Sequence, residues 1–222
     1  MSLNSNDLPA GGGGNIEPLD VGTYPTRTVA IVDLGMQAQP AFQGKEKPPV
    51  NMIAFTYEFV DEFLQDEDGN DIEDKPRWLT EMMPFYQLTA EKAKSTARYK
   101  ALDPTNKYAG DFEQLTDIPC NVSIVHNPKK GEGGGVWENI GGVTAMREKD
   151  VKKCPALVND VVVFNLDVPT IEGWNALPSF VQDKIKGGLE YEGSTLYDLL
   201  KEQEAPFEPV NKEAGGDDES PY

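Results

Sequence analysis

The chain has 222 residues, and its 38 acidic against 20 basic residues give a formal net charge of -18 at pH 7. This length suits one good core with extensions or two small domains, and we expect one domain with flexible ends. Two cysteines, Cys120 and Cys154, are too few for a disulfide framework and lack a metal-ligand spacing, so we expect both to be reduced and structural.

No apolar run approaches the roughly 20 residues of a membrane-spanning helix. The polar start also lacks the basic and apolar parts of a signal peptide. We therefore expect no membrane partner and a soluble protein of the cytoplasm, or of the host cytoplasm if the protein is viral.

The negative charge is concentrated in two segments. Residues 58–74 hold nine acids and no base, and residues 201–222 hold seven acids and two bases. Residues 75–107 instead hold seven bases against three acids. Because affinity for phosphates comes from Lys and Arg releasing counterions, residues 75–107 indicate a basic working face within an acidic chain.

The first half of the chain is rich in strand signals. Residues 1–20 lack apolar periodicity and contain four consecutive glycines, so we expect a flexible N-terminal arm. Strands are predicted at 23–33 and 51–63, both rich in branched and aromatic residues. In the second strand, alternation places the three odd-numbered aromatic residues from 55 to 59 on one face.

The middle of the chain predicts a hairpin, a helix and a second hairpin. Asp68-Gly69 is a turn of the type that needs positive φ, and its return strand is expected at 75–83. Residues 89–102 place alanines among Lys, Glu and Arg with almost no branched residues, which predicts a helix. Its few large apolar side chains predict a surface position. Strands are expected at 120–126 and 136–146, joined by a long basic loop.

Three strands, a helix and two strands form the order of a five-stranded OB-type barrel. We therefore expect a mainly β fold with this barrel at 21–150. An accessory layer is expected at 151–203, with a short apolar run at 161–166. Residues 204–222 are too polar to bury themselves and predict a disordered acidic tail. Short helices are predicted in the accessory layer at 171–177, 179–186 and 195–202.

Basic and aromatic residues repeatedly stand side by side, as at Arg77-Trp78 and Lys107-Tyr108. A groove for single-stranded nucleic acid needs both types, because bases stack on rings while cations hold the backbone. The alternative is that rings such as Trp78 and Trp137 belong to the core, with charges on the opposite strand face. Tyr99 and Tyr108 have the better case for stacking, because they sit in polar surroundings. The expected DNA-binding set is Lys45, Lys47, Lys75, Arg77, Trp78, Tyr86, Lys92, Lys94, Arg98, Tyr99, Lys100, Lys107, Tyr108, Lys129, Lys130 and Trp137.

Other kinds of site find little support. The Gly-rich stretch 129–135 lacks the Gly-Lys-Ser/Thr ending of a phosphate loop and leads into a strand. Residues 66–70 carry calcium-like oxygen spacing, but Asp71 stands where an EF-hand needs Gly and Arg77 where it needs Glu. His126 has no thiol, second His or paired acid nearby in sequence. We expect no enzyme activity, no cofactor and no metal site.

The chain ends in Asp217, Asp218, Glu219, Ser220, Pro221 and Tyr222. This ending resembles the tip of the bacterial SSB family of single-stranded-DNA-binding proteins, whose tails finish in Asp-Asp-Asp-Ile-Pro-Phe. Glu219 and Tyr222 keep the chemistry of the family's residues, whereas Ser220 removes an apolar contact. Single-stranded-DNA-binding proteins of T7-like bacteriophages also end in an acidic tail with a last aromatic residue and carry an OB-fold core.

The resemblance implies a phage-type protein that coats single-stranded DNA during replication, recombination or repair. It also implies that the tip recruits partner enzymes and folds back over the basic groove when DNA is absent. An acidic terminus that serves only solubility remains an alternative for the tail. For the whole protein the alternatives are a virion structural or decoration protein and an inhibitor that imitates DNA. The oligomeric state stays open.

Overall fold

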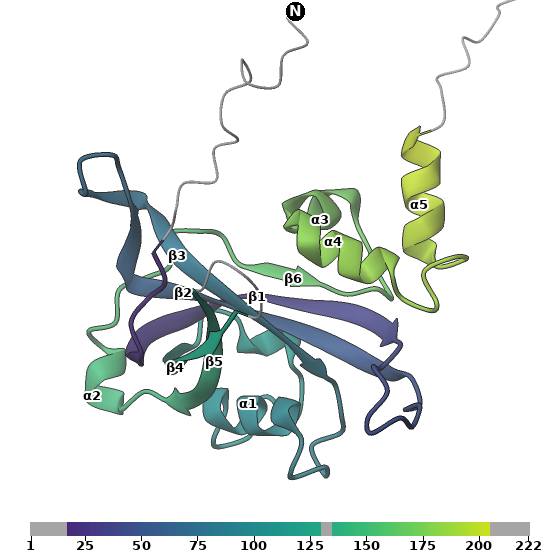
Figure 1. Ribbon diagram of the computed structural model, residues 1–222, viewed down its shortest axis with the longest axis horizontal. Coiled ribbons are helices and arrows are strands. Elements are labelled where there is room, and N and C mark those ends of the chain that lie inside the picture. The colour runs from purple at the N-terminus through teal and green to yellow at the C-terminus, as the bar shows by residue number, and fades with distance from the viewer. Residues whose placement is uncertain (1–16, 130–134, 205–222) are drawn as a thin grey trace, which may run out of the picture.

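A computed structural model describes residues 17–129 and 135–204 of the chain. Its centre is a long, twisted, mainly antiparallel sheet (Figure 1). The hydrogen-bonded order is β3-β2-β1-β4-β5, and β6 joins the free part of β1 in parallel. A mainly β fold is thus confirmed. The strands are β1 Gly22–Gln37, β2 Val50–Gln65, β3 Asp71–Pro84, β4 Pro119–Pro128, β5 Val136–Ala145 and β6 Val162–Phe164.

Alternation along the strands divides the buried side chains between two cores, one on each face of the sheet. In β2 the rings of Phe55, Tyr57 and Phe59 enter the first core, as their spacing predicts, whereas Ala54 enters the second. The tight turn between β2 and β3 is also confirmed, because Gly69 has a φ of +83°. The alternating pattern of the sequence therefore determines which side chains face each of the two cores.

The first core is closed from below by α1, Lys94–Leu102, and by the short helical turn η2, Glu113–Leu115 (Figure 1). The second core lies under residues 162–204, which we call the C-terminal layer and which contribute Trp174 and Val181. Among the described residues, no helix has the length and apolarity needed to cross a membrane. The remaining helices are α2 Glu148–Val151, α3 Ile171–Ala176, α4 Ser179–Lys186 and α5 Thr195–Glu204.

The five main strands do not close into a hydrogen-bonded barrel within the described residues, because β3 and β5 are not paired through their backbones. The two strands still come close, and Arg77 of β3 bridges to Glu138 of β5 at 2.9 Å. We call this junction the seam. A side-chain ion pair therefore stands where backbone pairing would close the sheet.

Part of the expected N-terminal arm belongs to the folded body. The Arg77 Nη1 group donates to the Glu17 carbonyl at 2.8 Å, and the Leu19 backbone N–H donates to Glu138. The His126 ring nitrogen Nε2 lies 2.6 Å from the Leu19 carbonyl oxygen, and the Leu19 side chain is buried in the first core. The fold thus begins before Gly22, because residues 17–20 cover the inner side of the seam.

The helix α1 is shorter and more deeply buried than its sequence predicts. It begins at Lys94 because residues 87–93 form successive turns. The prediction of a surface helix is wrong, since Arg98 is 5% exposed and Tyr99 is 1% exposed. The Arg98 guanidinium donates to both carboxylate oxygens of Glu81 on β3. A buried counter-ion on another element allows this polar helix to pack inward.

We expect Arg98→Ala to lower the free energy of unfolding by about 3–5 kcal/mol, because it leaves the buried Glu81 carboxylate without its main partner. Urea denaturation of the full chain measures this. Lys94→Ala is the matched control, since Lys94 contacts the same carboxylate at 2.7 Å but is 45% exposed. Its loss should cost about 1 kcal/mol or less. Equal effects of the two substitutions would contradict the assignment.

Candidate nucleic-acid interface

Two tryptophans flank the seam on its outer side. Trp78 follows Arg77 on β3, and Trp137 precedes Glu138 on β5. Because adjacent strand residues point to opposite faces, the inward ion pair turns both rings outward. Trp78 is 46% exposed and Trp137 is 61% exposed. The alternative that both rings belong to the core is therefore wrong.

Lys129 completes this surface. It lies at the end of the β4–β5 hairpin, and its Nζ sits 4.5 Å from the centre of the Trp137 ring. A cation over an exposed indole is held by the ring quadrupole and leaves its positive charge facing solvent. Four of the expected residues, namely Arg77, Trp78, Lys129 and Trp137, are thus brought together at the seam.

A buried carboxylate that sequence reasoning missed holds Trp78 in place. Glu58 of β2 is directly opposite Trp78 in the β2–β3 register and accepts from its indole N–H at 3.2 Å. The same carboxylate accepts from the backbone N–H of Val158 at 2.7 Å and from the Asn159 side-chain amide at 2.7 Å. Glu58 therefore ties the ring to the segment that leads into the C-terminal layer.

The seam is not uniformly basic. Two acids of β2, the exposed Asp61 and the half-buried Glu62, precede the acidic hairpin tip. Burial raises the pKa of Glu62, and the neighbouring charge of Asp61 raises it further, while Arg77 lowers it. A polyanion approaching this side of the seam would meet these charges. The geometry therefore favours a backbone path over Lys129, on the β5 side.

Other expected residues form separate surface groups. Tyr86 and Lys92 are exposed before α1, and Lys94 and Lys100 are exposed on it. Lys75 is exposed on β3. Among these, Lys94 forms an ion pair with Glu81. Among the described residues, no hydrogen bond or ion pair joins Tyr86, Lys92, Lys94 or Lys100 to the seam, so these four form a second surface group.

Lys45 and Lys47 lie in the loop between the C-terminal end of β1 and the start of β2. The backbones of Phe42 and Lys45 exchange hydrogen bonds of 2.9 and 3.0 Å around a tight turn. Both central residues, Gln43 and Gly44, have positive φ, as in hairpin turns of type I′. The Lys47 Nζ lies 4.8 Å from the centre of the exposed Phe42 ring. The exposed Phe42, which was not among the expected residues, therefore belongs to the same surface as these two lysines.

Two expected residues are in the wrong place for a surface role. Arg98 is bound to Glu81, and the Tyr99 hydroxyl donates to Asp103 at 3.0 Å inside the first core. Both are therefore structural. The expectation that Tyr99 stacks on a base is wrong, because its ring is buried and its hydroxyl is bonded to Asp103. The polar residues next to Tyr99 in the sequence gave no sign of this contact. Lys130 and the tip at 217–222 lie outside the described residues.

Asp103 organises the loop that carries the last expected pair. Its carboxylate accepts from the backbone N–H groups of Lys107 and Tyr108, both at 2.8 Å. The Lys107 Nζ lies 4.8 Å from the centre of the half-buried Tyr108 ring. Burial raises the pKa of Asp103, but these hydrogen bonds outweigh burial and hold the pKa below its ordinary value.

No protein-family model matches this chain, and a search of curated proteins finds no significant match. Any functional conclusion therefore rests on the residues and their arrangement.

The lowered pKa of Asp103 predicts acid sensitivity of the loop at 103–110. A carboxylate with a depressed folded pKa contributes stability above its unfolded pKa of about 3.9, and that stability is lost as the pH falls through the folded value. Amide hydrogen-exchange protection of Lys107 and Tyr108 should therefore drop on acidification. Asp103→Asn should show the loss already at pH 7, whereas Asp111→Asn should not. Unchanged protection in Asp103→Asn would refute this role.

Proposed function

We propose that this protein binds single-stranded DNA and coats exposed strands during replication, recombination or repair. One observation carries the proposal, namely the outward-facing Trp137 with Lys129 over its ring, together with a second exposed ring, Trp78, on the other strand of the seam. Rings this exposed contribute little to core packing. Bases stack on such rings without regard to sequence, and the adjacent cation meets the backbone.

The distribution of basic groups supports a path in which single-stranded DNA crosses the β-sheet. In the β1–β4 register Gly22 pairs with Ile124, near the hairpin that carries Lys129. In the β1–β2 register Gln37 pairs with Val50, next to the turn that carries Lys45 and Lys47. The two basic loops thus lie at opposite ends of the 16-residue β1. Lysines at both ends of β1 would bind DNA phosphates and so hold the DNA strand over the sheet.

We further propose that the fold is an OB-type barrel. The element order agrees with that fold, because α1 lies between the third and fourth strands and closes the bottom of the first core. The seam then corresponds to the place where the third and fifth strands would meet. OB folds bind through a sheet face and the loops joining strands one to two and four to five, and those two loops hold Lys45, Lys47 and Lys129.

The acidic tip is proposed to recruit replication or recombination enzymes. Its terminal aromatic and carboxylates offer one anchor for an apolar pocket and others for a basic rim. A tethered tip reaches an effective concentration of about millimolar near the basic surface of its own domain, and DNA phosphates would displace it.

Replacing either seam tryptophan tests DNA binding directly. We expect Trp137→Ala and Trp78→Ala each to weaken binding to oligo(dT) by about 1–3 kcal/mol, because each removes one stacking platform. Fluorescence polarisation over a salt series measures this. Lys129→Ala should lower the slope of log K against log salt by about 0.7. The matched control is Phe180→Ala, an exposed ring in the C-terminal layer that should leave affinity unchanged.

Absence of oligo(dT) binding at low salt would refute the proposal and favour a structural role in a particle. Equal losses in Trp137→Ala and Phe180→Ala would place the DNA elsewhere.

Deleting residues 217–222 tests the tail. We expect the truncated protein to bind oligo(dT) more tightly at low salt, because a competing anion has been removed. The same deletion should abolish capture of the partner enzyme. A second variant that keeps the charges but replaces Tyr222 by Ser separates the two roles, since it should lose only the partner. Unchanged behaviour of the deletion in both assays would contradict the tail mechanism.

A further inference from the structure

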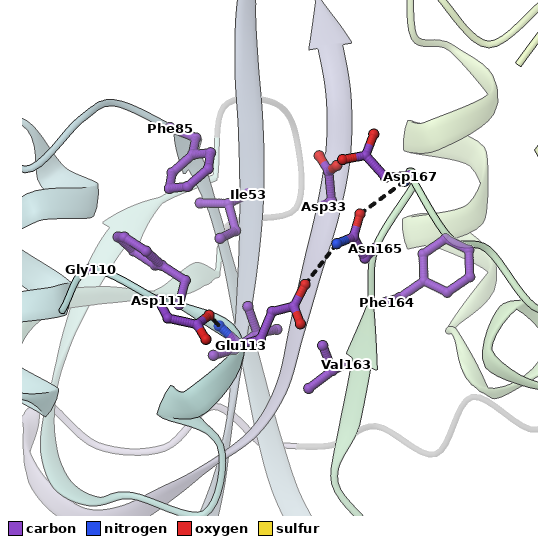
Figure 2. A pocket seen from close by; sticks show the side chains of 12 residues that line it. Asp33, Ile53, Phe85, Gly110, Asp111, Glu113, Val163, Phe164, Asn165 and Asp167 are labelled. Atoms are coloured by element: carbon purple, nitrogen blue, oxygen red, sulfur yellow. Dashed lines mark hydrogen bonds between the residues drawn. The ribbon is translucent and has the colours of Figure 1, made fainter. Parts of the chain in front are cut away.

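A hollow on another part of the sheet is lined by carboxylates and apolar side chains. It has a volume of about 300 Å³ and opens where β1 leaves its pairing with β4 and begins its pairing with β6. Its floor is apolar and includes Ile31 of β1, Ile53 of β2 and Val163 of β6. Figure 2 shows the ring of Phe85 at one side, with the loop from Gly110 to Glu113 below it.

Four carboxylates surround this floor, and none of its lining residues is Lys or Arg. The acids are Asp33, Asp111, Glu113 and Asp167. None of them takes part in the ion pairs found among the described residues. Asp33 and Asp167 lie beside each other in Figure 2. Burial raises the pKa of Asp33, hydrogen bonds from the backbone N–H groups of Gly35 and Leu166 lower it, and the charges of Asp167 and Glu190 raise it further, so that the pKa lies above its ordinary value.

The hollow is held in shape by hydrogen bonds across its two sides. The Asn165 side-chain amide after β6 donates to Glu113 at 2.7 Å. The Asn165 oxygen in turn accepts from the backbone N–H of Asp167 at 2.9 Å. Phe85 and Phe112 pack edge to face with ring centres 4.9 Å apart. The floor and its acidic rim therefore form one connected arrangement.

The chemistry of the hollow selects its ligand. Four negative charges repel phosphates, so this is not a DNA surface. Within the described residues no group of three or more acids, histidines or cysteines is placed to hold a metal ion. The acids are instead spread around an apolar floor with an aromatic wall. An arginine side chain fits this arrangement, because its guanidinium is weakly hydrated, stacks on aromatic rings and binds carboxylates through two parallel hydrogen bonds.

The arginine has to come from another protein. The chain contains four arginines, Arg27, Arg77, Arg98 and Arg147. All four are already ion-paired, to Asp117, Glu138, Glu81 and Asp150 in that order. We propose that this acid-rimmed hollow is a docking site for an arginine side chain on a basic segment of a partner protein. A site of about 300 Å³ takes one such side chain, since pockets for whole small molecules range from that size upward.

A pair of short peptides tests the proposal on the full chain without DNA, so its outcome is separate from that of the DNA-binding proposal. The probe is acetyl-Gly-Ser-Arg-Ser-Gly-amide, and the neutral control carries citrulline in place of arginine. In amide NMR titrations we expect the arginine peptide to shift residues 110–113 and 163–167. The citrulline peptide should bind about tenfold more weakly or not at all, a difference of about 1.4 kcal/mol.

Matched variants complete the test. Asp33→Asn combined with Glu113→Gln should weaken binding of the arginine peptide about tenfold. Glu46→Gln combined with Glu91→Gln removes the same charge from exposed positions outside the hollow and should leave binding unchanged. The dispersion of the NMR spectrum confirms that each variant is folded.

Equal binding of the citrulline peptide would overturn the proposal, as would shifts confined to other surfaces. Equal binding of a lysine peptide would overturn the assignment to a guanidinium. Shifts at the same residues that depend on protein concentration alone would show that a second copy occupies the hollow, which also overturns it.

Discussion

The whole structure depends on β1 being buried on both faces. Ile31 enters the first core, whereas Val32 and Leu34 enter the second. A strand of this kind cannot sit at the surface of a single sheet layer, because one row of apolar side chains would face water. The first core with α1 must cover one face and the C-terminal layer the other. The accessory helices are therefore as necessary to the fold as the main sheet.

Two bulges allow β1 to serve both layers. Its pairing with β2 shifts between Thr28 and Ala30 and again between Asp33 and Gly35. Each shift inserts one extra residue, which bends the strand and increases its twist. At the second bulge Gly35 has a φ of +67°, and a Cβ there would lie 3.0 Å from the Leu166 side chain. The curved strand can then exchange its partner β4 for β6 along its length.

Both candidate sites lie where a strand of the sheet changes its pairing partner or has no backbone partner. The seam lies where β3 and β5 meet through an ion pair, and its exposed rings and Lys129 form the proposed DNA-binding surface. The hollow lies where β1 passes from β4 to β6, and its carboxylates suit a cation. Such discontinuities expose side chains that regular pairing would cover. A surface with exposed rings and a lysine and a hollow rimmed by carboxylates can therefore coexist on one chain.

Sequence patterns by themselves determined the strands, the hairpin at Gly69, the helix between the third and fourth strands and the separation of basic from acidic segments. These features depend on neighbours in the chain, through alternation, turn geometry and helix propensity. Only the tertiary structure decided which rings are exposed and which charges are available. Arg98 and Tyr99 look like surface residues until Glu81 and Asp103 are placed beside them, and Trp78 looks like a core residue until the seam turns it outward. Burial and ion pairing depend on elements distant in sequence, and local patterns do not record those contacts.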